Sequence, residues 1–472
     1  MPPRVARCLW AGLAIPGAVL VDLVLSAGPA AAHNVSAGSL PAPSWLLGYV
    51  GAFAVVATAI ALRSSWPKPR LRIGVEVESD PRPEAVGPRR TTWLGPVGHG
   101  VGLVLLGSIL YAAFVGPDIG AANIAPVTVF VIWAVGLPML CLLVGDVMRA
   151  INPFLPIVAL VERVRRGRTD PSPSDAPVAP GPAAEAPAWT AAAFLFAFSW
   201  FYLAYHSPGS PRATAVFLVV YGAAAVAGGV RWGRAWLGWG EGFAAISRSV
   251  AQLVRRRDEP HPPGLLPLIV VWVGATAFDA VSSTTFWIDV EGATAGWTRT
   301  LVNTIGLLWL TGVAAVVVML ALRAVDGRTG GSAPDDGDEE VAVAATRWPG
   351  TSPAGLLGLA LVPVGAAWFI AHDLTILMFE GQNFFILLSD PLGRGWDLFG
   401  TIDHTINYRI VTAGWVRWVQ LGALLVGHIV AVVLAHDGAL RVVGRRRGMR
   451  VTWTATAVSA VSVVGAALLV LK

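Results

Sequence analysis

The sequence predicts an all-α integral membrane protein: a polytopic bundle of about ten transmembrane helices after an N-terminal signal or anchor segment. Of the 472 residues, 55% are hydrophobic and 13% are charged, against about 25% charged residues in a typical soluble domain. Long apolar runs recur along the chain, and the arginines gather in every second connecting segment. Low charge, repeated apolar runs and alternating arginine content together exclude a soluble globular protein.

The first 32 residues resemble an export signal. Two arginines precede an apolar run over 8–25, and small residues at Ala30 and Ala32 suit cleavage after Ala32. Asp22 lies inside the apolar run, which is unusual for a signal peptide. The segment 1–32 is therefore expected to be either a cleaved signal or an uncleaved anchor helix.

Residues 33–472 are expected to form a single helical membrane domain. Ten apolar segments each approach the ~20 residues that cross ~30 Å of hydrocarbon. They lie near 43–63, 97–117, 121–147, 188–205, 213–231, 264–286, 299–323, 353–378, 411–436 and 451–471. The two cysteines, Cys8 and Cys141, both fall in apolar runs, which predicts no disulfide framework.

Arginine content orients these segments. The connection 63–90 and the connections after the third, fifth and ninth segments are rich in arginine, whereas 118–120 and 287–296 carry none. Arginine-rich loops stay cytoplasmic, so the protein is expected in the plasma membrane with its mature N-terminus and C-terminus outside. This pattern makes the lipid bilayer the expected partner of the basic residues and argues against nucleic-acid binding.

Several connections have a composition of their own. Segments 168–187 and 326–346 are rich in Pro, Gly, Ala and acidic residues, which predicts disordered cytoplasmic loops. Segments 154–168 and 243–257 place apolar residues on one helical face next to arginines, which predicts helices lying along the inner membrane surface. Segment 379–410 is expected to be an extracellular cap loop, with a turn at 389–395 whose glycines supply positive φ angles.

The candidate site is a run of polar residues that begins inside the eighth apolar segment. Ionisable groups within membrane helices are costly to bury and are functional candidates by default. The candidate ligand-binding residues, including two from outer ends of other helices, are His206, Asp279, His372, Asp373, Glu380, Gln382, Asn383, Asp403 and His404.

The residue types allow more than one chemistry. Imidazole and carboxylate groups suit a transition-metal ion, for which the candidate ligands are His372, Asp373 and His404. A hydrolytic site would use His372, Asp373 and Glu380 as its catalytic groups. Interhelical hydrogen bonding explains the same residues without any ligand. Because His428 is expected about 16 Å deeper than His372, a haem or metal shared by these two histidines is not expected.

The chain resembles a family of multi-pass membrane proteins of high-GC Gram-positive bacteria commonly labelled fenitrothion hydrolase. The residues that carry the resemblance are Ala32-His33, 40–46, 66–71, Arg149-Ala150-Ile151-Asn152-Pro153, Ala277-Phe278-Asp279, 284–287, Phe379-Glu380-Gly381-Gln382-Asn383 and 389–401. The label implies hydrolysis of organophosphate esters, without catalytic residues that could be carried over to this sequence.

Three functions follow from these observations. The leading hypothesis is a transporter or accessory permease whose outer polar cluster binds an ion or small solute. The first alternative is a membrane-bound, metal-dependent hydrolase of phosphoesters, in which a bound metal activates water. The second alternative is a structural or assembly partner in a membrane complex.

Overall fold

The computed structural model describes residues 42–71, 94–166, 189–255, 264–326 and 353–471. Every regular element in these ranges is helical. The predicted signal or anchor segment 1–32 and the loop 168–187 lie outside the described residues, as does the loop 326–346 apart from its first residue.

The helices follow the ten predicted segments. They are α2 (Ser44–Ser65), α3 (Leu94–Val115), η1 (Gly120–Ala122), α4 (Ile124–Val127), η2 (Thr128–Gly136), α5 (Leu137–Val144), α6 (Val147–Ile151), α7 (Phe154–Arg166), α8 (Thr190–Ser199), η4 (Trp200–Ala204), α9 (Pro211–Trp232), η5 (Arg234–Trp236), α10 (Leu237–Gly240), α11 (Gly242–Arg255), α12 (Leu265–Ser282), α13 (Thr285–Glu291), α14 (Gly296–Asp326), α16 (Pro353–Leu388) and α17 (Ala413–Val470). Among the described residues, nine helices are long and apolar enough to cross a membrane, and the segment 188–205 forms a shorter apolar helix over Thr190–Ala204. The predicted all-α polytopic fold is confirmed.

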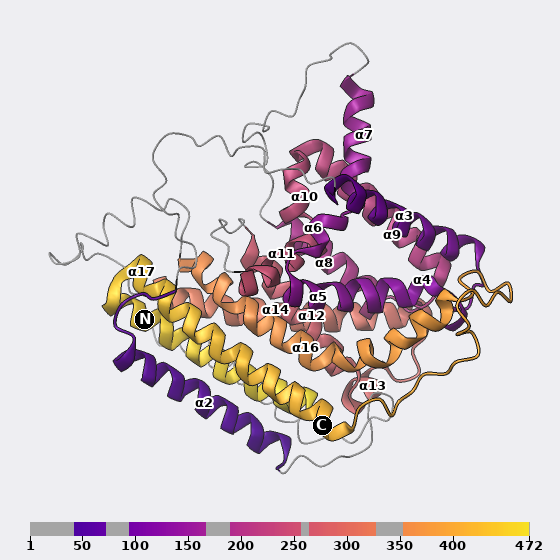
Figure 1. The fold of residues 1–472 in the computed structure, drawn as a ribbon. Coiled ribbons are helices and arrows are strands. Elements are labelled where there is room, and N and C mark those ends of the chain that lie inside the picture. Colours follow the sequence, from indigo (N-terminus) through magenta and orange to yellow (C-terminus); the bar gives the residue numbers. More distant parts are fainter. Residues whose placement is uncertain (1–41, 72–93, 167–188, 256–263, 327–352, 472) are drawn as a thin grey trace.

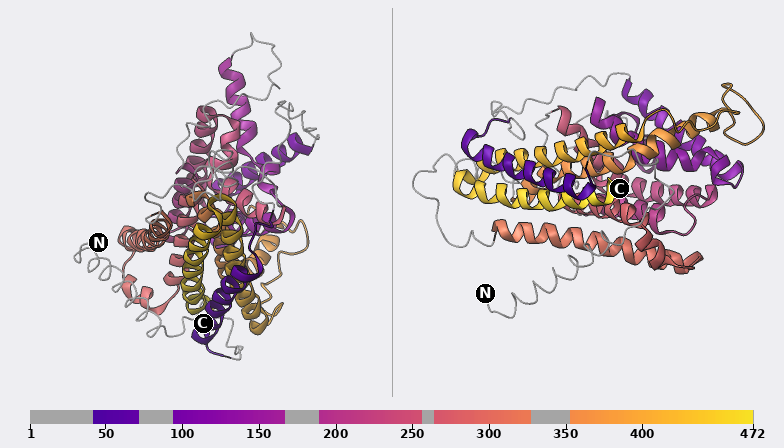
Figure 2. Two further views of the ribbon diagram at one scale, coloured as in Figure 1. Left: turned by 90° about the vertical axis from the view of Figure 1, so that its left-hand side faces the viewer. Right: turned by 90° about the horizontal axis from the view of Figure 1, so that it is seen from below.

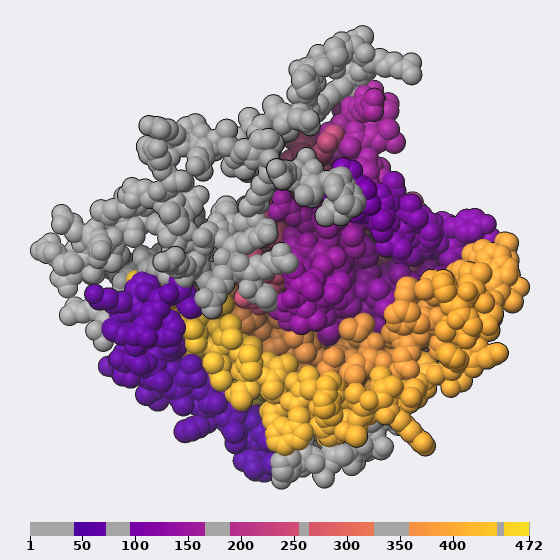
Figure 3. Space-filling model, in the orientation of Figure 1, coloured from indigo at the N-terminus to yellow at the C-terminus, as the bar shows by residue number. Residues whose placement is uncertain are grey.

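The element α17 doubles back on itself to form two antiparallel arms, Ala413–Leu440 and Gly448–Val470. His428 contacts Ser462, and His436 contacts Thr452, so positions on the two arms pair across the turn. The arms pack between α2 and α16 (Figure 1). Figure 2 shows α14 running along the length of the bundle, and in Figure 3 α2 and the α17 arms form one flank of the surface.

The first arm of α17 crosses α16 closely at Gly427. A Cβ atom at this position would lie 2.4 Å from the Cβ of Ala367 and 2.6 Å from the carbonyl oxygen of Pro363. We expect Gly427→Val to destabilise the protein by about 1–3 kcal/mol through overpacking, seen as a lower midpoint of thermal unfolding in detergent. Gly422 lies on the same arm with open space around it, so Gly422→Val is the matched control. Equal midpoints for the two variants would contradict the close crossing.

The connections predicted to share a side of the membrane lie together in space. Asp118 pairs with Arg212 at 3.3 Å, and a Cβ on Gly393 would lie 2.8 Å from the ring of Pro117. We call this end of the bundle, which carries residues 389–412, the loop end. At the opposite end, called the turn end, Arg234 pairs with Glu162 at 2.8 Å.

Two predictions about local structure are wrong. The eighth segment does not stop at 378, because α16 continues through Gly381 to Leu388, and the irregular loop covers only 389–412. The extension is helical since Leu387 and its apolar neighbours pack against α4 and η2. The helix α11 does not lie on a membrane surface; it packs against α5 and α8, with Phe243 and Ser247 buried. The turn after Leu388 is as predicted, with positive φ at Gly393 and Gly395.

Candidate functional site

Three ionisable side chains from α12 and α16 meet in the interior of the bundle. The Nε2 atom of His372 lies 3.2 Å from Oδ2 of Asp279, and Asp373 is buried beside them. One nitrogen or oxygen atom from each of the three residues lies within 4.8 Å of the others. Such a separation allows one small cation to contact all three side chains. We call this group the Asp–His–Asp cluster.

Main-chain carbonyl groups at or beside the clustered residues accept hydrogen bonds from two polar side chains. The hydroxyl of Ser282 donates a hydrogen bond to the carbonyl oxygen of Asp279 at 2.8 Å in the last turn of α12. Nε2 of Gln420 on α17 donates to the carbonyl oxygen of Ala371 at 2.7 Å, directly before His372. These bonds fix both backbones from which the clustered side chains project.

A cavity of about 70 Å³ adjoins the two carboxylates. Asp279 and Asp373 line it together with Tyr202 and Phe130. Tyr202 lies in η4 and Phe130 in η2, and both segments are π-helical. The two rings stack with centroids 5.0 Å apart. Since π-helical turns are rare and frequently occur at functional sites, two of them beside one buried cluster favour a functional role.

The cluster is deeper along α16 than predicted. His372 lies 16 residues before Leu388, the end of α16, which corresponds to about 24 Å at 1.5 Å per residue. The predicted segment 353–378 would instead place His372 six residues, or about 9 Å, from the end of its helix. Asp279, in contrast, lies in the last turn of α12. The cluster thus lies well before the end of α16 but close to the end of α12.

The other predicted ligands do not join the cluster. The main-chain N–H of His206 donates to Oγ1 of Thr300 at 3.0 Å, and its ring lies at the same distance from that oxygen. Asp403 and His404 are exposed in the 389–412 loop. Within the described part of the chain, the Asp–His–Asp cluster is the one group of three potential metal ligands close enough to share an ion, so the proposed ligand His404 is replaced by Asp279.

The polar residues in the last turns of α16 have a different role. Nε2 of Gln382 donates to the carbonyl oxygen of Asn407 at 3.2 Å, and the main-chain N–H of Asn407 donates to Oε1 of Gln382 at 2.9 Å. This reciprocal pair ties the 389–412 loop to the helix. Glu380 and Asn383 lie in the same turns, about 10 Å or more along the axis from Asp373.

His428 is hydrogen-bonded within α17. Its Nδ1 lies 2.6 Å from the carbonyl oxygen of Leu424, and its Nε2 lies 3.0 Å from the hydroxyl of Ser462. Both ring nitrogens are therefore occupied within α17, and the histidine links the two arms of the hairpin.

Sequence reasoning did not identify Gln420 or Tyr202 as parts of the site. Gln420 could have been found, because a lone amide inside the apolar run 411–436 is as unusual as a charge. Tyr202 gave no comparable signal, since aromatic residues are common in its segment. Comparison with protein-family models, with curated proteins and with solved structures finds no match to this chain.

Proposed function

We propose that this protein binds a divalent transition-metal cation at Asp279, His372 and Asp373, in exchange for two protons, and that it acts as a membrane transporter or permease for that cation. The observation that carries the proposal is the convergence of two carboxylates and one imidazole inside membrane-spanning helices. This donor set suits zinc and neighbouring first-row metals, with a position left for water.

Charge balance supports a divalent cation. Net charge is costly in the low-dielectric interior of a membrane protein. With His372 neutral and both carboxylates ionised, the cluster carries two negative charges, which one divalent cation neutralises. Without the cation, a protonated His372 paired with ionised Asp279, next to a protonated Asp373, is also neutral. The two neutral states differ by one divalent cation and two protons.

The size of the cavity favours an ion over an organic substrate. The space beside the carboxylates is about 70 Å³, whereas pockets for organic ligands usually measure about 300–1,000 Å³. The alternative of a metal-dependent phosphoester hydrolase, implied by the resemblance to proteins labelled fenitrothion hydrolase, requires an aryl phosphoester next to the metal. We therefore favour ion binding over ester hydrolysis.

The π-helical segments support movement of the ion. A π-helical turn holds one residue more than an α-helical turn, and a change between the two rotates the following residues. Phe130 and Tyr202 line the cavity from these segments, so such a change would reshape the walls of the site. The arginine distribution further favours an orientation with the loop end outside the cell.

Flux measurements test the transport proposal. Proteoliposomes containing a zinc-sensitive dye inside and a pH-sensitive dye are exposed to external Zn²⁺. We expect Zn²⁺ to enter while protons leave, and we expect His372→Ala to abolish both signals. Zn²⁺ entry no faster than in protein-free liposomes would overturn the transporter proposal.

A further inference from the structure

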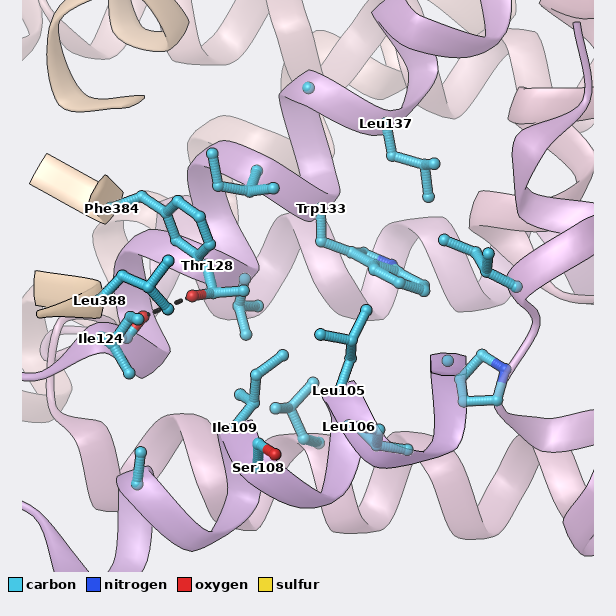
Figure 4. A pocket seen from close by; sticks show the side chains of 18 of the residues that line it. Leu105, Leu106, Ser108, Ile109, Ile124, Thr128, Trp133, Leu137, Phe384 and Leu388 are labelled. Carbon is cyan, nitrogen blue, oxygen red and sulfur yellow. Dashed lines mark hydrogen bonds between the residues drawn. The ribbon is translucent and has the colours of Figure 1, made fainter. Parts of the chain in front are cut away.

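A second and much larger cavity borders α16 and η2, and Phe198 and Phe243 line both this cavity and the one beside the Asp–His–Asp cluster. Its volume is about 1240 Å³, and it is lined by residues of α3, α4, η2, α5 and α16. Figure 4 shows Leu105 and Ile109 from α3, Trp133 from η2 and Phe384 from α16 pointing into it. The lining extends from Phe399 in the 389–412 loop to Pro153 beside α6. The cavity thus runs from the loop end toward the turn end.

Two polar groups on the wall, the hydroxyl of Thr128 and the amide of Gln382, are already hydrogen-bonded within the protein. The hydroxyl of Thr128 donates to the carbonyl oxygen of Ile124 at 2.7 Å, as the dashed line in Figure 4 marks. The amide of Gln382 is held by Asn407. Most of the other lining residues are apolar, so the wall presents mainly hydrocarbon.

Glu241, an ionisable residue in the lining, is also hydrogen-bonded within the protein. Its carboxylate accepts hydrogen bonds from the main-chain N–H groups of Phe243 and Ala244, at 3.0 and 2.8 Å, and from the hydroxyl of Tyr221. Burial raises the pKa of Glu241 above its ordinary value. The residue thus caps α11, and its carboxylate oxygens are occupied by partners within the protein.

The cavity reaches the lipid-facing surface. Val104 and Leu105 of α3 and Phe385 of α16 line the cavity, and their exposed fractions are 67%, 48% and 62%. In a membrane-spanning helix such apolar side chains face hydrocarbon. A lipid chain can therefore enter between α3 and α16 without passing through water.

We propose that this cavity holds an acyl chain of a membrane phospholipid. The space of about 1240 Å³ is lined mainly by apolar side chains and opens between α3 and α16 to the surface that faces hydrocarbon. Apolar walls do not hold ordered water, and the bilayer supplies acyl chains at the opening. A retained chain fills the space between α3 and α16.

Photolabelling tests this assignment. The protein is placed in nanodiscs with phosphatidylglycerol that carries a diazirine in its acyl chain, illuminated, and digested for mass spectrometry. The informative residue is Trp133, which points into the cavity (Figure 4), because bulk lipid contacts mainly the outer face of α3. We expect a phospholipid adduct on the peptide that contains Trp133.

Filling the cavity should displace the chain. Gly107 lines the cavity, and a Cβ atom added there would have no neighbouring atom within 4 Å; Gly100 on the same helix is equally open but lies outside the lining. We expect Gly107→Trp to lower the Trp133 adduct about tenfold by steric exclusion, and Gly100→Trp to leave it unchanged. Equal adducts in the two variants, or none in the unmodified protein, would overturn the proposal.

A second substitution keeps the test decisive if Gly107→Trp does not fold. Gly381 lines the cavity from α16, and a Cβ there would have Leu377 as its nearest neighbour at 3.8 Å, so Gly381→Leu should also reduce the adduct. Recovery of an isoprenoid, in place of a phospholipid, from the washed protein would overturn the identity of the occupant.

Discussion

His372→Ala and Asp373→Asn are each expected to weaken Zn²⁺ binding by about 100-fold or more, because each removes one of three protein ligands. The three donor atoms lie within 4.8 Å of one another, and two ligands cannot complete the same coordination shell. The affinity is measured by isothermal titration calorimetry of the protein in nanodiscs. Asp279→Asn should have a similar effect.

The chain offers matched controls for both residue types. His404 is an exposed histidine in the 389–412 loop, and Asp118 is a partly exposed carboxylate that pairs with Arg212. We expect His404→Ala and Asp118→Asn to bind Zn²⁺ like the unmodified protein. A loss of affinity in His404→Ala equal to that in His372→Ala would mean that the loop, and not the Asp–His–Asp cluster, provides the ligand.

Zn²⁺ affinity is expected to fall steeply as the pH is lowered. If binding releases two protons, the apparent dissociation constant rises about 100-fold for each pH unit of acidification, in the range where the cation-free cluster holds both protons. The affinity falls with falling pH because protons compete with Zn²⁺ for Asp373 and His372 and occupy them when the cation leaves. Titrations at several pH values measure the slope.

One variant tests the origin of that slope. In Asp373→Asn the amide cannot release a proton, so the dissociation constant should change by about tenfold per pH unit. Matched titrations in buffers with different ionisation enthalpies give the proton count independently. A slope that is the same in Asp373→Asn and in the unmodified protein would show that the second proton comes from another group.

The membrane fold was predictable because it depends on composition and length. Apolar runs of about 20 residues have few stable alternatives in a bilayer, so the predicted segments and the observed helices agree. Asp279 and His372 could be selected for the same reason, since each is an ionisable group in an apolar run. Their approach to 3.2 Å depends on how α12 and α16 pack.

Helix ends and local helix type were not predictable. The sequence predicts a helix end near residue 378, but α16 continues to Leu388, where Leu387 packs against α4 and η2. His206 pairs instead with Thr300, and His404 is exposed in the 389–412 loop. The π-helical form of η2 and η4 has no signature in their apolar sequences.

X-ray absorption at the zinc edge of the Zn²⁺-loaded protein tests the central claim most directly. The cation site predicts one imidazole nitrogen at about 2.0–2.1 Å and carboxylate oxygens at about 2.0–2.2 Å. The imidazole contribution should disappear in His372→Ala and remain in His404→Ala. Spectra with water oxygens alone, or spectra that do not change in His372→Ala, would contradict a cation site at Asp279, His372 and Asp373.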